Sequence, residues 1–530
     1  HRTAGGHQGP SPVAPRAGWR GMAAKPDERF PSMTELLAVL SRDPMAVYQR
    51  VGAMVAVAGL TGAVSFAAAS AGSTELEICP DAHAELAGIW DAPRQSSVRE
   101  ALRALASPAA DEALTLAEPR LAGYAEEWVA MRNEACLAHA EGRQSEQLFD
   151  LRTSCLDQRR AGFDALVGAF TTADSKDLGG LIKAVTEMPP LATCADAKAL
   201  TAAIPPPEDP TTRVQVQQAR ETLARAETLK HAGKFAAGLQ IVEEILPQAM
   251  TTKYEPLVVE TLVQKGDLQM EHGERAAAIT SFWTALWPAI RVGYDTGAAE
   301  ASSKLAFLHA MTGDMTTAEQ LLPWASALNQ RVEKDIDRYA EWLNNQGVLR
   351  LKLDEPGEAK RLWTESLELR EHHGRARTWR ALDTRWNLAD LADRRRDYER
   401  AVAMYQQLVV LSTEILGENH PRRLYYEMLL AESLLPLGRP TEALLRLQRL
   451  VRSDHLTEGS REHVRGLFSL GNVELALGDT QSARRCLSDA LEMQAREDSL
   501  YLALLAYLMK ATALGGDPEA FETYHKSALA

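Results

Sequence analysis

Residues 342–363 read WLNNQGVLRLKLDEPGEAKRLW, and four positions in this stretch recur through the C-terminal half of the chain. Gly347 is followed seven residues later by a turn position, Asp354. The small residue Ala359 comes five residues after the turn, and the bulky Trp363 comes four residues after Ala359. This spacing predicts two helices joined by a tight turn. Small residues let the paired helices approach, and the bulky residue fills the space between neighbouring pairs.

The pattern repeats with a period of about 40 residues. The small residue recurs at intervals of 40, 40, 41, 42, 42, 40 and 37 residues, at Gly238, Ala278, Ala318, Ala359, Ala401, Ala443, Ala483 and Ala520. Six of the eight turn positions are Gly, as a left-handed helix C-cap favours. They are Gly233, Gly273, Gly313, Asp354, Arg396, Gly438, Gly478 and Gly515. A fixed period of this length predicts stacked helix pairs that bury their apolar faces only against neighbouring pairs.

The pattern resembles the tetratricopeptide repeat. The period near 42 residues, with the sequence GENHP at 417–421 between units, is similar to the longer repeat class of kinesin light chains. The resemblance implies about eight repeats over residues 213–530, forming a right-handed superhelix. Its concave groove would hold a peptide or an extended segment of another protein, and its role would be that of a scaffold rather than a catalyst.

Seven side chains are candidates for contacting a ligand in this groove. They are Asn345, Asn387, Asn472, Trp386, Tyr425, Met428 and Phe468. An amide both donates and accepts hydrogen bonds, so the three Asn side chains can bind a peptide backbone without reading its sequence. The four large apolar side chains would supply pockets. The alternative is that the amides join local networks and the large side chains pack between repeats.

A cluster of basic side chains lies within residues 375–396. Arg375, Arg377 and Arg380 are followed by a second group of three at 394–396. These side chains would suit an acidic tail of a partner, but such a cluster on a helix is also typical of a solvated surface.

Residues 77–204 predict a helical domain without an obvious repeat, and the proline-rich residues 205–212 predict a linker to the repeats. Cys79, Cys136, Cys155 and Cys194 all lie in this domain. An even set in a domain outside the cytoplasm suggests two disulfides, with three connectivities open. The preferred pairing is Cys79 with Cys194 and Cys136 with Cys155, because the latter two flank a predicted turn between two helices. Four free thiols are the alternative.

The stretch from Val51 to Gly72 contains no charged side chain. Roughly 20 apolar residues cross a bilayer as a helix, so residues 47–72 predict a transmembrane helix. Residues 1–50 hold seven Lys or Arg against four Asp or Glu, a net charge of +3. Positive flanks stay in the cytoplasm, which predicts a single-pass inner-membrane protein with a periplasmic C-terminal region. Small residues such as Ala58 and Gly62 would permit a homodimer. A buried soluble helix or a signal peptide is the alternative.

The sequence RGMAAKPDERFPSM at 20–33 resembles the last subdomain of bacterial eukaryotic-like Ser/Thr protein kinases, in which KPxxRFPSM opens the final helix. The resemblance implies that residues 20–44 are the C-terminal remnant of a kinase domain and that Arg29 has a structural role in it. Three segments of the 77–204 domain also resemble the outer segment of receptor-like kinases. Residues 1–19, rich in Gly, Pro and Arg, predict disorder.

Composition and missing motifs limit the function. Ala and Leu dominate, aromatics make up only 6%, and alternating β-branched runs are missing, which favours an all-α fold. The glycine-rich loop, HRDLxxxN and DFG motifs of kinases are absent, so we expect no enzymatic activity from this chain. No metal-ligand or cofactor motif occurs. The net charge of −14 argues against nucleic acid as a partner.

These observations predict a protein- or peptide-binding repeat scaffold that acts as the sensor part of a membrane Ser/Thr protein kinase in signal transduction. The alternative is a free-standing repeat adaptor, membrane-anchored or soluble, with no kinase attached.

Overall fold

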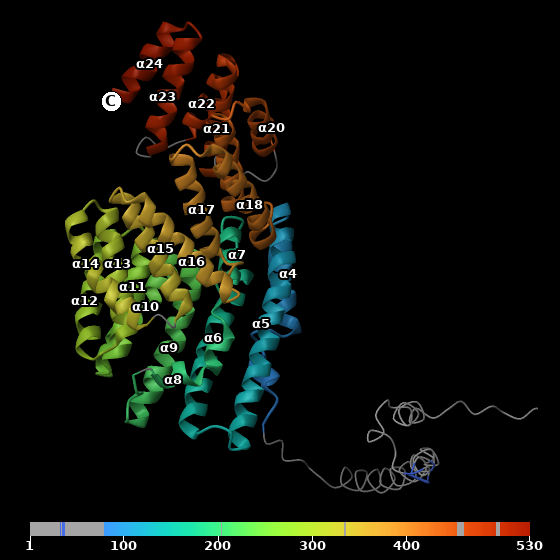
Figure 1. Ribbon diagram of the computed structural model, residues 1–530, viewed down its shortest axis with the longest axis vertical. Coiled ribbons are helices and arrows are strands. Elements are labelled where there is room, and N and C mark those ends of the chain that lie inside the picture. Colours follow the sequence, from blue (N-terminus) through green and yellow to red (C-terminus); the bar gives the residue numbers. More distant parts are fainter. Residues whose placement is uncertain are drawn as a thin grey trace, which may run out of the picture. The chain divides into compact units, whose positions relative to one another are not determined.

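The computed structural model describes most of the chain after Ile78 (Figure 1). The residues it describes are Ser32, Thr34, Glu35, Leu37 and 79–530, except 203, 333–334, 453–460, 494–498 and 530. The chain forms two compact units, His1–Ile78 and Cys79–Ala530. In the first unit Thr34, Glu35 and Leu37 are helical, and Ser32 Oγ accepts a hydrogen bond from the backbone N–H of Glu35 (3.3 Å). The predictions for residues 1–19, for Arg29 and for the 47–72 helix lie outside the described residues.

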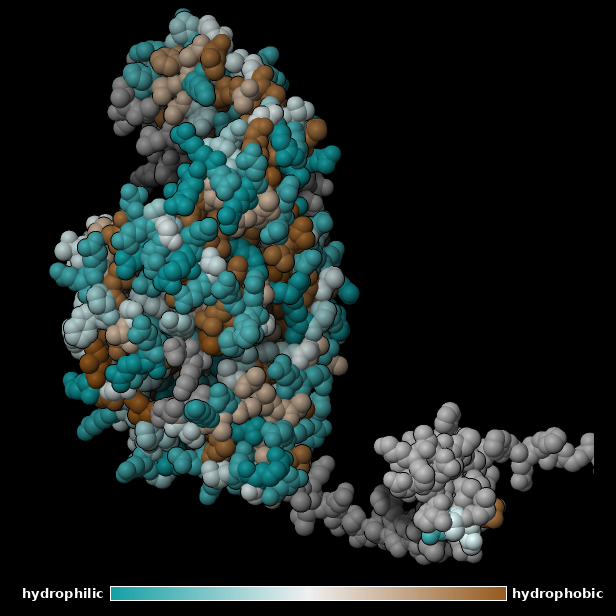
Figure 2. All heavy atoms as spheres, in the orientation of Figure 1, coloured by the Kyte–Doolittle hydropathy of each residue, from teal (hydrophilic) through white to brown (hydrophobic). Residues whose placement is uncertain are grey.

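The predicted single-pass membrane localisation is not supported by the structure, and we withdraw it. Among the described residues, no helix combines the length and the apolar character needed to cross a bilayer. The stretch from Val51 to Gly72, on which both the span and the homodimer through Ala58 and Gly62 were predicted, lies outside those residues. Figure 2 shows hydrophilic side chains interspersed with hydrophobic ones over the visible face of the second unit.

The second unit is all α, as predicted, with no strand in its described residues. Its first part, here called the N-terminal region, consists of two 3-10 helices and five α-helices. These are η2 (Ala82–Leu86), α4 (Ala92–Ala104), α5 (Pro108–Ala140), α6 (Glu146–Thr171), α7 (Leu178–Thr186), η3 (Leu191–Ala195) and α8 (Ala197–Ala202). Asp91, Ser107 and Ser145 each cap the following helix, because a side-chain oxygen accepts a hydrogen bond from a backbone N–H of the first turn.

Sixteen helices follow in the described residues and form eight consecutive pairs, here called repeats 1 to 8 (Figure 1). The first four pairs are α9 (Pro210–His231) with α10 (Phe235–Thr251), α11 (Glu255–Glu271) with α12 (Arg275–Arg291), α13 (Asp295–Met311) with α14 (Met315–Arg331), and α15 (Ile336–Lys352) with α16 (Pro356–His372). The last four are α17 (Trp379–Arg394) with α18 (Tyr398–Leu416), α19 (Pro421–Leu434) with α20 (Pro440–Val451), α21 (Arg461–Leu477) with α22 (Thr480–Glu492), and α23 (Ser499–Leu514) with α24 (Pro518–Leu529). The arrangement is that of tetratricopeptide-like repeats.

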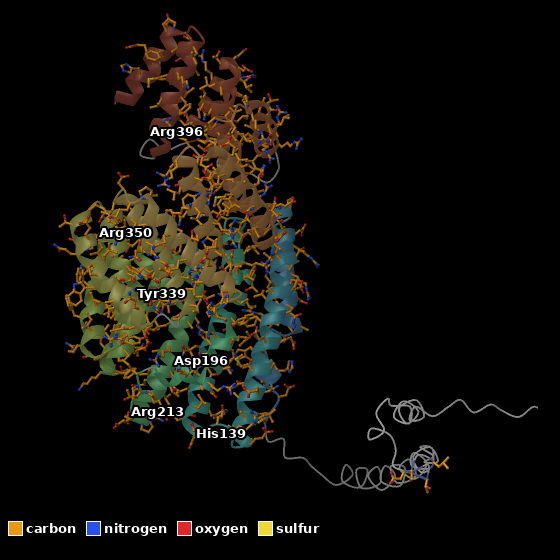
Figure 3. The ribbon with its side chains drawn as sticks, viewed as in Figure 1. His139, Asp196, Arg213, Tyr339, Arg350 and Arg396 are labelled. Atoms are coloured by element: carbon orange, nitrogen blue, oxygen red, sulfur yellow. A yellow bond between two sulfur atoms is a disulfide. The ribbon has the colours of Figure 1, made fainter. Side chains whose placement is uncertain are left out.

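The turn within each pair has the left-handed backbone that the sequence predicts. Seven of the predicted turn residues have positive φ, including the two that are not Gly, Asp354 (+58°) and Arg396 (+61°, labelled in Figure 3). In the last repeat the left-handed residue is Gly516 (+72°) rather than Gly515. A left-handed residue ends the first helix by letting the following N–H groups bond back to its last carbonyls, so the second helix can start within a few residues.

In repeats 2 and 4 a small and a bulky position of the pattern pack together within the pair. A Cβ built at Gly266 would lie 2.8 Å from Cζ of Phe282, and one built at Gly347 would lie 2.5 Å from Nε1 of Trp363. Both aromatic side chains are buried. The glycines therefore create space that rings of the second helix of the same pair fill, whereas the sequence pattern predicted that the bulky residues fill the space between neighbouring pairs.

The predicted linker does not separate two independent domains. The first helix of the repeats, α9, starts within this linker, at Pro210 instead of residue 213. It is capped by Asp209, whose Oδ2 accepts a hydrogen bond from the backbone N–H of Thr212 (2.7 Å). The N-terminal region packs on repeat 1 at two glycines. A Cβ at Gly162 would lie 2.9 Å from Oγ1 of Thr228, and one at Gly180 would lie 2.2 Å from the carbonyl oxygen of Ala232. One hydrophobic core also joins buried side chains of α4–α7 to those of α17–α20.

The disulfides differ from the preferred pairing. The structure joins Cys79 to Cys136 and Cys155 to Cys194. The segment after Cys79 is held on α5 because the backbone N–H of Ala82 donates to Oδ1 of Asn133 (3.1 Å), one turn before Cys136.

The second bridge has a similar local cause. Arg159, one turn after Cys155, donates to Oγ1 of Thr193 (3.4 Å), which brings Cys194 onto α6. The α5–α6 hairpin itself places other residues opposite each other, among them His139 and Phe149, whose rings stack at 4.6 Å. Cys136 and Cys155 therefore do not pair across the hairpin.

Candidate functional site

Four aromatic side chains lie on the first helices of repeats 5 to 8 and form what we call the aromatic row. Trp386 of α17 and Tyr425 of α19 have ring centroids 6.4 Å apart, and Phe468 of α21 lies 5.0 Å from Tyr507 of α23. All four side chains are half-buried. The structure thus places three residues predicted from the sequence in two ring pairs, one between Trp386 and Tyr425 and one between Phe468 and Tyr507 of repeat 8.

Cations lie against this row. The guanidinium of Arg422 is 5.5 Å from the ring centroid of Trp386, that of Arg465 is 5.3 Å from Tyr425, and Nζ of Lys510 is 5.8 Å from Tyr507. Cations within about 6 Å of a ring are attracted by its negative face. The ring nitrogen of Trp386 and Nε of Arg465 are buried and make no hydrogen bond within the described chain. Both are donors that have no acceptor within the described chain.

Met428 does not belong to the site, which corrects its prediction as a groove residue. Its side chain is fully buried and belongs to the core that α19 shares with the N-terminal region. Met428 occupies the same position in its repeat as Trp386 and Phe468. The repeat pattern does not show which helix faces the N-terminal region covers.

The predicted asparagines have different surroundings. Asn387 Nδ2 donates to Oδ1 of Asn344 (2.9 Å), and Thr384 Oγ1 donates to the same oxygen (3.1 Å). Asn387 therefore joins a local network with Asn344, which was the alternative for it. Asn345 on α15 and Asn472 on α21 are both half-buried.

A chain of ion pairs, here called the charge ladder, crosses the first helices of repeats 1 to 5. Its members, of alternating sign, are Lys230, Asp267, Lys304, Glu341 and Arg380, followed by Glu187 of the N-terminal region. The N–O distances between the first five are 2.8, 3.4, 2.9 and 3.1 Å in that order. The members on the repeats are 37, 37, 37 and 39 residues apart. Because the period is near 40, each step moves about one turn along the next helix, and this spacing is a signal that the sequence carries.

The ladder residues are charged in the folded protein. Burial alone would raise the pKa of Asp267, but Lys230 and Lys304 outweigh it and lower that pKa. Likewise burial would lower the pKa of Lys304, yet Asp267 and Glu341 raise it. Burying charges is costly unless each has a partner, so the ladder fixes which helices lie next to each other more than it adds to stability.

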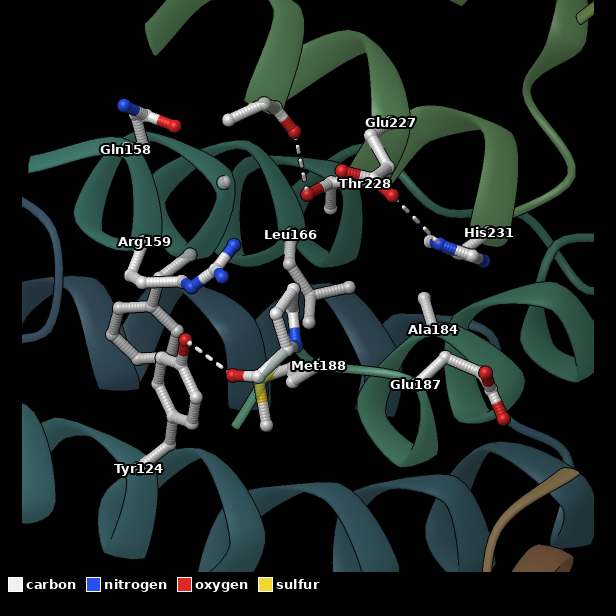
Figure 4. A pocket seen from close by; sticks show the side chains of 14 residues that line it. Tyr124, Gln158, Arg159, Leu166, Ala184, Glu187, Met188, Glu227, Thr228 and His231 are labelled. Carbon is white, nitrogen blue, oxygen red and sulfur yellow. Dashed lines mark hydrogen bonds and ion pairs between the residues drawn. The ribbon is translucent and has the colours of Figure 1, made fainter. Parts of the chain in front are cut away.

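A small cavity lies where the N-terminal region meets α9 (Figure 4). The hydroxyl of Tyr124 donates to the carbonyl of Pro189 (3.2 Å) at one side, and His231 lies 3.8 Å from Glu227 at the other. Its volume of about 30 Å³ suits one or two water molecules. The cavity is too small for a peptide, and the described residues contain no group of side chains that could hold a metal ion.

A larger, open cleft of about 540 Å³ lies between α14 and α15. Leu322 and Pro323 line one wall, and Gln346 and Arg350 line the other. Its two walls come from repeats 3 and 4, so the cleft is a gap between successive repeats rather than part of the aromatic row.

No family model matches the sequence, and no curated protein matches it. Solved structures similar to the chain include BtubC (BKLC) from P. vanneervenii, at 21% identity and a TM-score of 0.36, covering 41% of this chain and 89% of that one. A tetratricopeptide repeat protein from Parabacteroides merdae is 18% identical with a TM-score of 0.38, over 55% of this chain and 99% of that one. The apo form of RapI is 12% identical with a TM-score of 0.44, over 69% of this chain and 96% of that one.

Proposed function

We propose that this chain is a non-catalytic scaffold that binds an extended segment of another protein along the aromatic row. The observation that carries the proposal is the placement of Trp386, Tyr425 and Phe468 on successive first helices, with Arg422 against the ring of Trp386 and Arg465 against the ring of Tyr425. Half-buried aromatic side chains next to Arg are the residue types that dominate binding energy at protein interfaces.

The rest of the first-helix face supports this placement. In repeats 1 to 5 the charge ladder satisfies the charged side chains between neighbouring helices, and the N-terminal region packs on α9 and α17–α20. Two donors of the row, the ring nitrogen of Trp386 in repeat 5 and Nε of Arg465 in repeat 7, have no acceptor within the described chain. The backbone carbonyls of an extended segment would supply acceptors for the ring nitrogen of Trp386 and for Arg465.

Affinity capture with matched variants tests the proposal. The triple variant Trp386→Ala/Tyr425→Ala/Phe468→Ala is compared with the control Val410→Ala/Leu445→Ala, whose side chains are 58% and 50% exposed on second helices. We expect the wild-type chain and the control to retain the same proteins from an extract of the source cells, and the triple variant to lose them. Equal retention by all three would refute a binding role for the row.

The resemblance of residues 20–33 to a kinase subdomain supports a more specific role. We propose that the scaffold is the sensing part of a Ser/Thr protein kinase, so that occupancy of the row influences phosphorylation. The coding sequence directly upstream of His1 tests this, because a kinase requires HRD and DFG motifs there. Their absence would leave an adaptor without an attached kinase.

A further inference from the structure

Glu187 is the one member of the charge ladder that does not belong to a repeat. It follows α7 and begins a non-helical stretch, 187–190, that leads to η3. One carboxylate oxygen accepts a hydrogen bond from the backbone N–H of Arg380 (3.3 Å), and the other pairs with the Arg380 guanidinium. Only 2% of its side chain is exposed. A residue of the N-terminal region thus inserts a carboxylate between the first helices of the repeats.

The carboxylate pairs with Arg380 of repeat 5, and a second buried cation, Arg370 of repeat 4, lies near enough to help lower the pKa of Glu187. Arg370 at the end of α16 is 1% exposed, and its Nε and Nη1 make no hydrogen bond within the described chain. Its nearest acid is Asp337, at 3.7 Å. Arg380 also pairs with Glu341 (3.1 Å). Without Glu187, Arg380 would lose the more buried of its two carboxylate partners. Arg370 has two buried nitrogen atoms that make no hydrogen bond within the described chain.

The first three arginines of the basic cluster that the sequence suggested for an acidic tail are engaged within the chain. Arg375 pairs with Asp337 (3.2 Å), Arg377 with Glu414 (2.9 Å) and Arg380 with Glu187. The first two partners come from neighbouring repeats. Only Arg380 takes its partner from the N-terminal region.

The non-helical stretch that carries Glu187 has few backbone donors, while the side chain of Met188 packs on the hydrophobic core and the carbonyl of Pro190 accepts a hydrogen bond from the hydroxyl of Thr193 (2.7 Å). Pro189 and Pro190 have no backbone N–H, and the carbonyl of Pro189 accepts one hydrogen bond, from the hydroxyl of Tyr124. The Cys155–Cys194 bridge tethers the segment a few residues later. A tethered ligand competes at an effective concentration in the millimolar range, so a free ligand binds only when the segment withdraws.

We propose that Arg370 and Arg380 form a carboxylate-binding site on repeats 4 and 5, which Glu187 fills from within the chain and which an acidic, extended segment of a partner protein fills in its place. The site is separate from the aromatic row, so it stands or falls independently of the proposed function. The chemistry that suits it is a Glu or Asp side chain followed by residues that need no backbone donors, as in 187–190.

A peptide-binding measurement on the full chain tests this site. The probe is a labelled, end-blocked peptide with the sequence TEMPPLAT, residues 186–193. The receptor is a variant that cannot fill the site, Glu187→Ser/Met188→Gly/Pro189→Ser/Pro190→Gly. By fluorescence anisotropy we expect the peptide to bind this variant at least about tenfold more tightly than the wild-type chain, because the internal competitor is gone.

Two controls identify the group that is recognised. Replacing Glu by Gln in the peptide should weaken binding about tenfold or more, and adding Arg380→Met to the receptor should have the same effect, since each removes one half of a buried charge pair. Glu187→Gln alone, which keeps the shape of the segment, should also bind the peptide more tightly than wild type and serves if the fourfold variant does not fold. Equal affinity for wild type and both variants, no binding to either variant, or an unaffected Gln peptide would overturn the proposal.

Discussion

The indole of Trp363 occupies the space that the missing side chain of Gly347 leaves open. A Cβ at Gly347 would lie 2.5 Å from Nε1 of Trp363, and Nε1 donates a hydrogen bond to the carbonyl of Asn344 (3.0 Å) on the same first helix. Phe282 and Gly266 form the same contact in repeat 2. The two helices of a repeat are therefore held by a ring from one helix placed against the bare backbone of the other.

This contact predicts that Gly347→Ala destabilises the protein. The added methyl group overlaps the indole, which cannot move away without breaking its hydrogen bond, and overpacking of this kind costs about 1–3 kcal/mol. Gly357→Ala is the matched control, because nothing lies within 4 Å of a Cβ there. That change should be stabilising by up to about 1 kcal/mol through helix propensity. Urea unfolding measures both, and equal effects of the two substitutions would contradict the packing described.

His420 predicts a loss of stability in mild acid. Its Nδ1 accepts a hydrogen bond from the backbone N–H of Arg422 (3.1 Å), so the proton of the neutral ring is on Nε2, which donates to the carbonyl of Gly179 (3.1 Å). Burial, with the charges of Arg422 and Lys183, lowers the pKa of His420 to about 4. Between this value and the ordinary 6.5 the unfolded chain binds a proton that the folded chain does not, so stability falls as the pH drops.

From pH 7 to pH 5 the loss from this residue is about 2 kcal/mol in the free energy of unfolding. His420→Asn keeps an acceptor at the helix start but does not titrate. The difference in unfolding free energy between wild type and this variant should therefore shrink by that amount over the same pH range. A difference that stays constant with pH would show that His420 titrates normally in the folded protein.

Replacing Lys304 tests how much one member of the charge ladder contributes to the stability of the protein. Lys304→Met leaves the carboxylates of Asp267 and Glu341 without their shared cation, and breaking a buried ion pair in this way costs about 3–5 kcal/mol. Arg361 is the control: it pairs with Glu358 (2.7 Å) and Glu365 on the surface, with 58% of its side chain exposed. Arg361→Ala should cost less than about 1 kcal/mol. Thermal or urea unfolding of the two variants distinguishes a buried ladder from an ordinary charged surface.

The disulfides predict a specific peptide map. Digestion without reduction should yield one linked pair containing Cys79 and Cys136 and another containing Cys155 and Cys194. Mass spectrometry reads both directly. Removing the second bridge with Cys155→Ala/Cys194→Ala should lower the free energy of unfolding by about 2–4 kcal/mol. Either of the other two connectivities in the map would contradict the packing of η3 on α6.

The parts of the fold that the sequence predicts are those set by neighbouring residues. The turn at Asp354, the small Ala359 and the bulky Trp363 lie within ten residues of one another, so their spacing alone specifies a helix pair. The contacts of the N-terminal region were not predictable in this way. Glu187 and Arg380 are 193 residues apart and share no pattern.

The residues of the candidate site were likewise predictable only where the repeat pattern specifies them. The repeat frame placed Trp386, Tyr425 and Phe468 on first helices, but it placed Met428 there too, because a frame gives the face of a helix and not what packs on it. The regular spacing of Lys230, Asp267 and Lys304 was present in the sequence and would have indicated the charge ladder. The disulfide pairing depended on Asn133 and Arg159, whose contacts are specific to the folded chain.

The central claim, that the aromatic row binds another protein, is tested most directly by site-specific photocrosslinking in the source cells. A photoreactive amino acid replaces Tyr425 or Phe468 in the full chain, and Val410 on the second helix α18 serves as the exposed control. The account predicts that positions 425 and 468 crosslink to the same partner, that Trp386→Ala suppresses both adducts, and that position 410 gives none. Adducts at position 410 without adducts at the row, or adducts at the row that Trp386→Ala leaves unchanged, would contradict it.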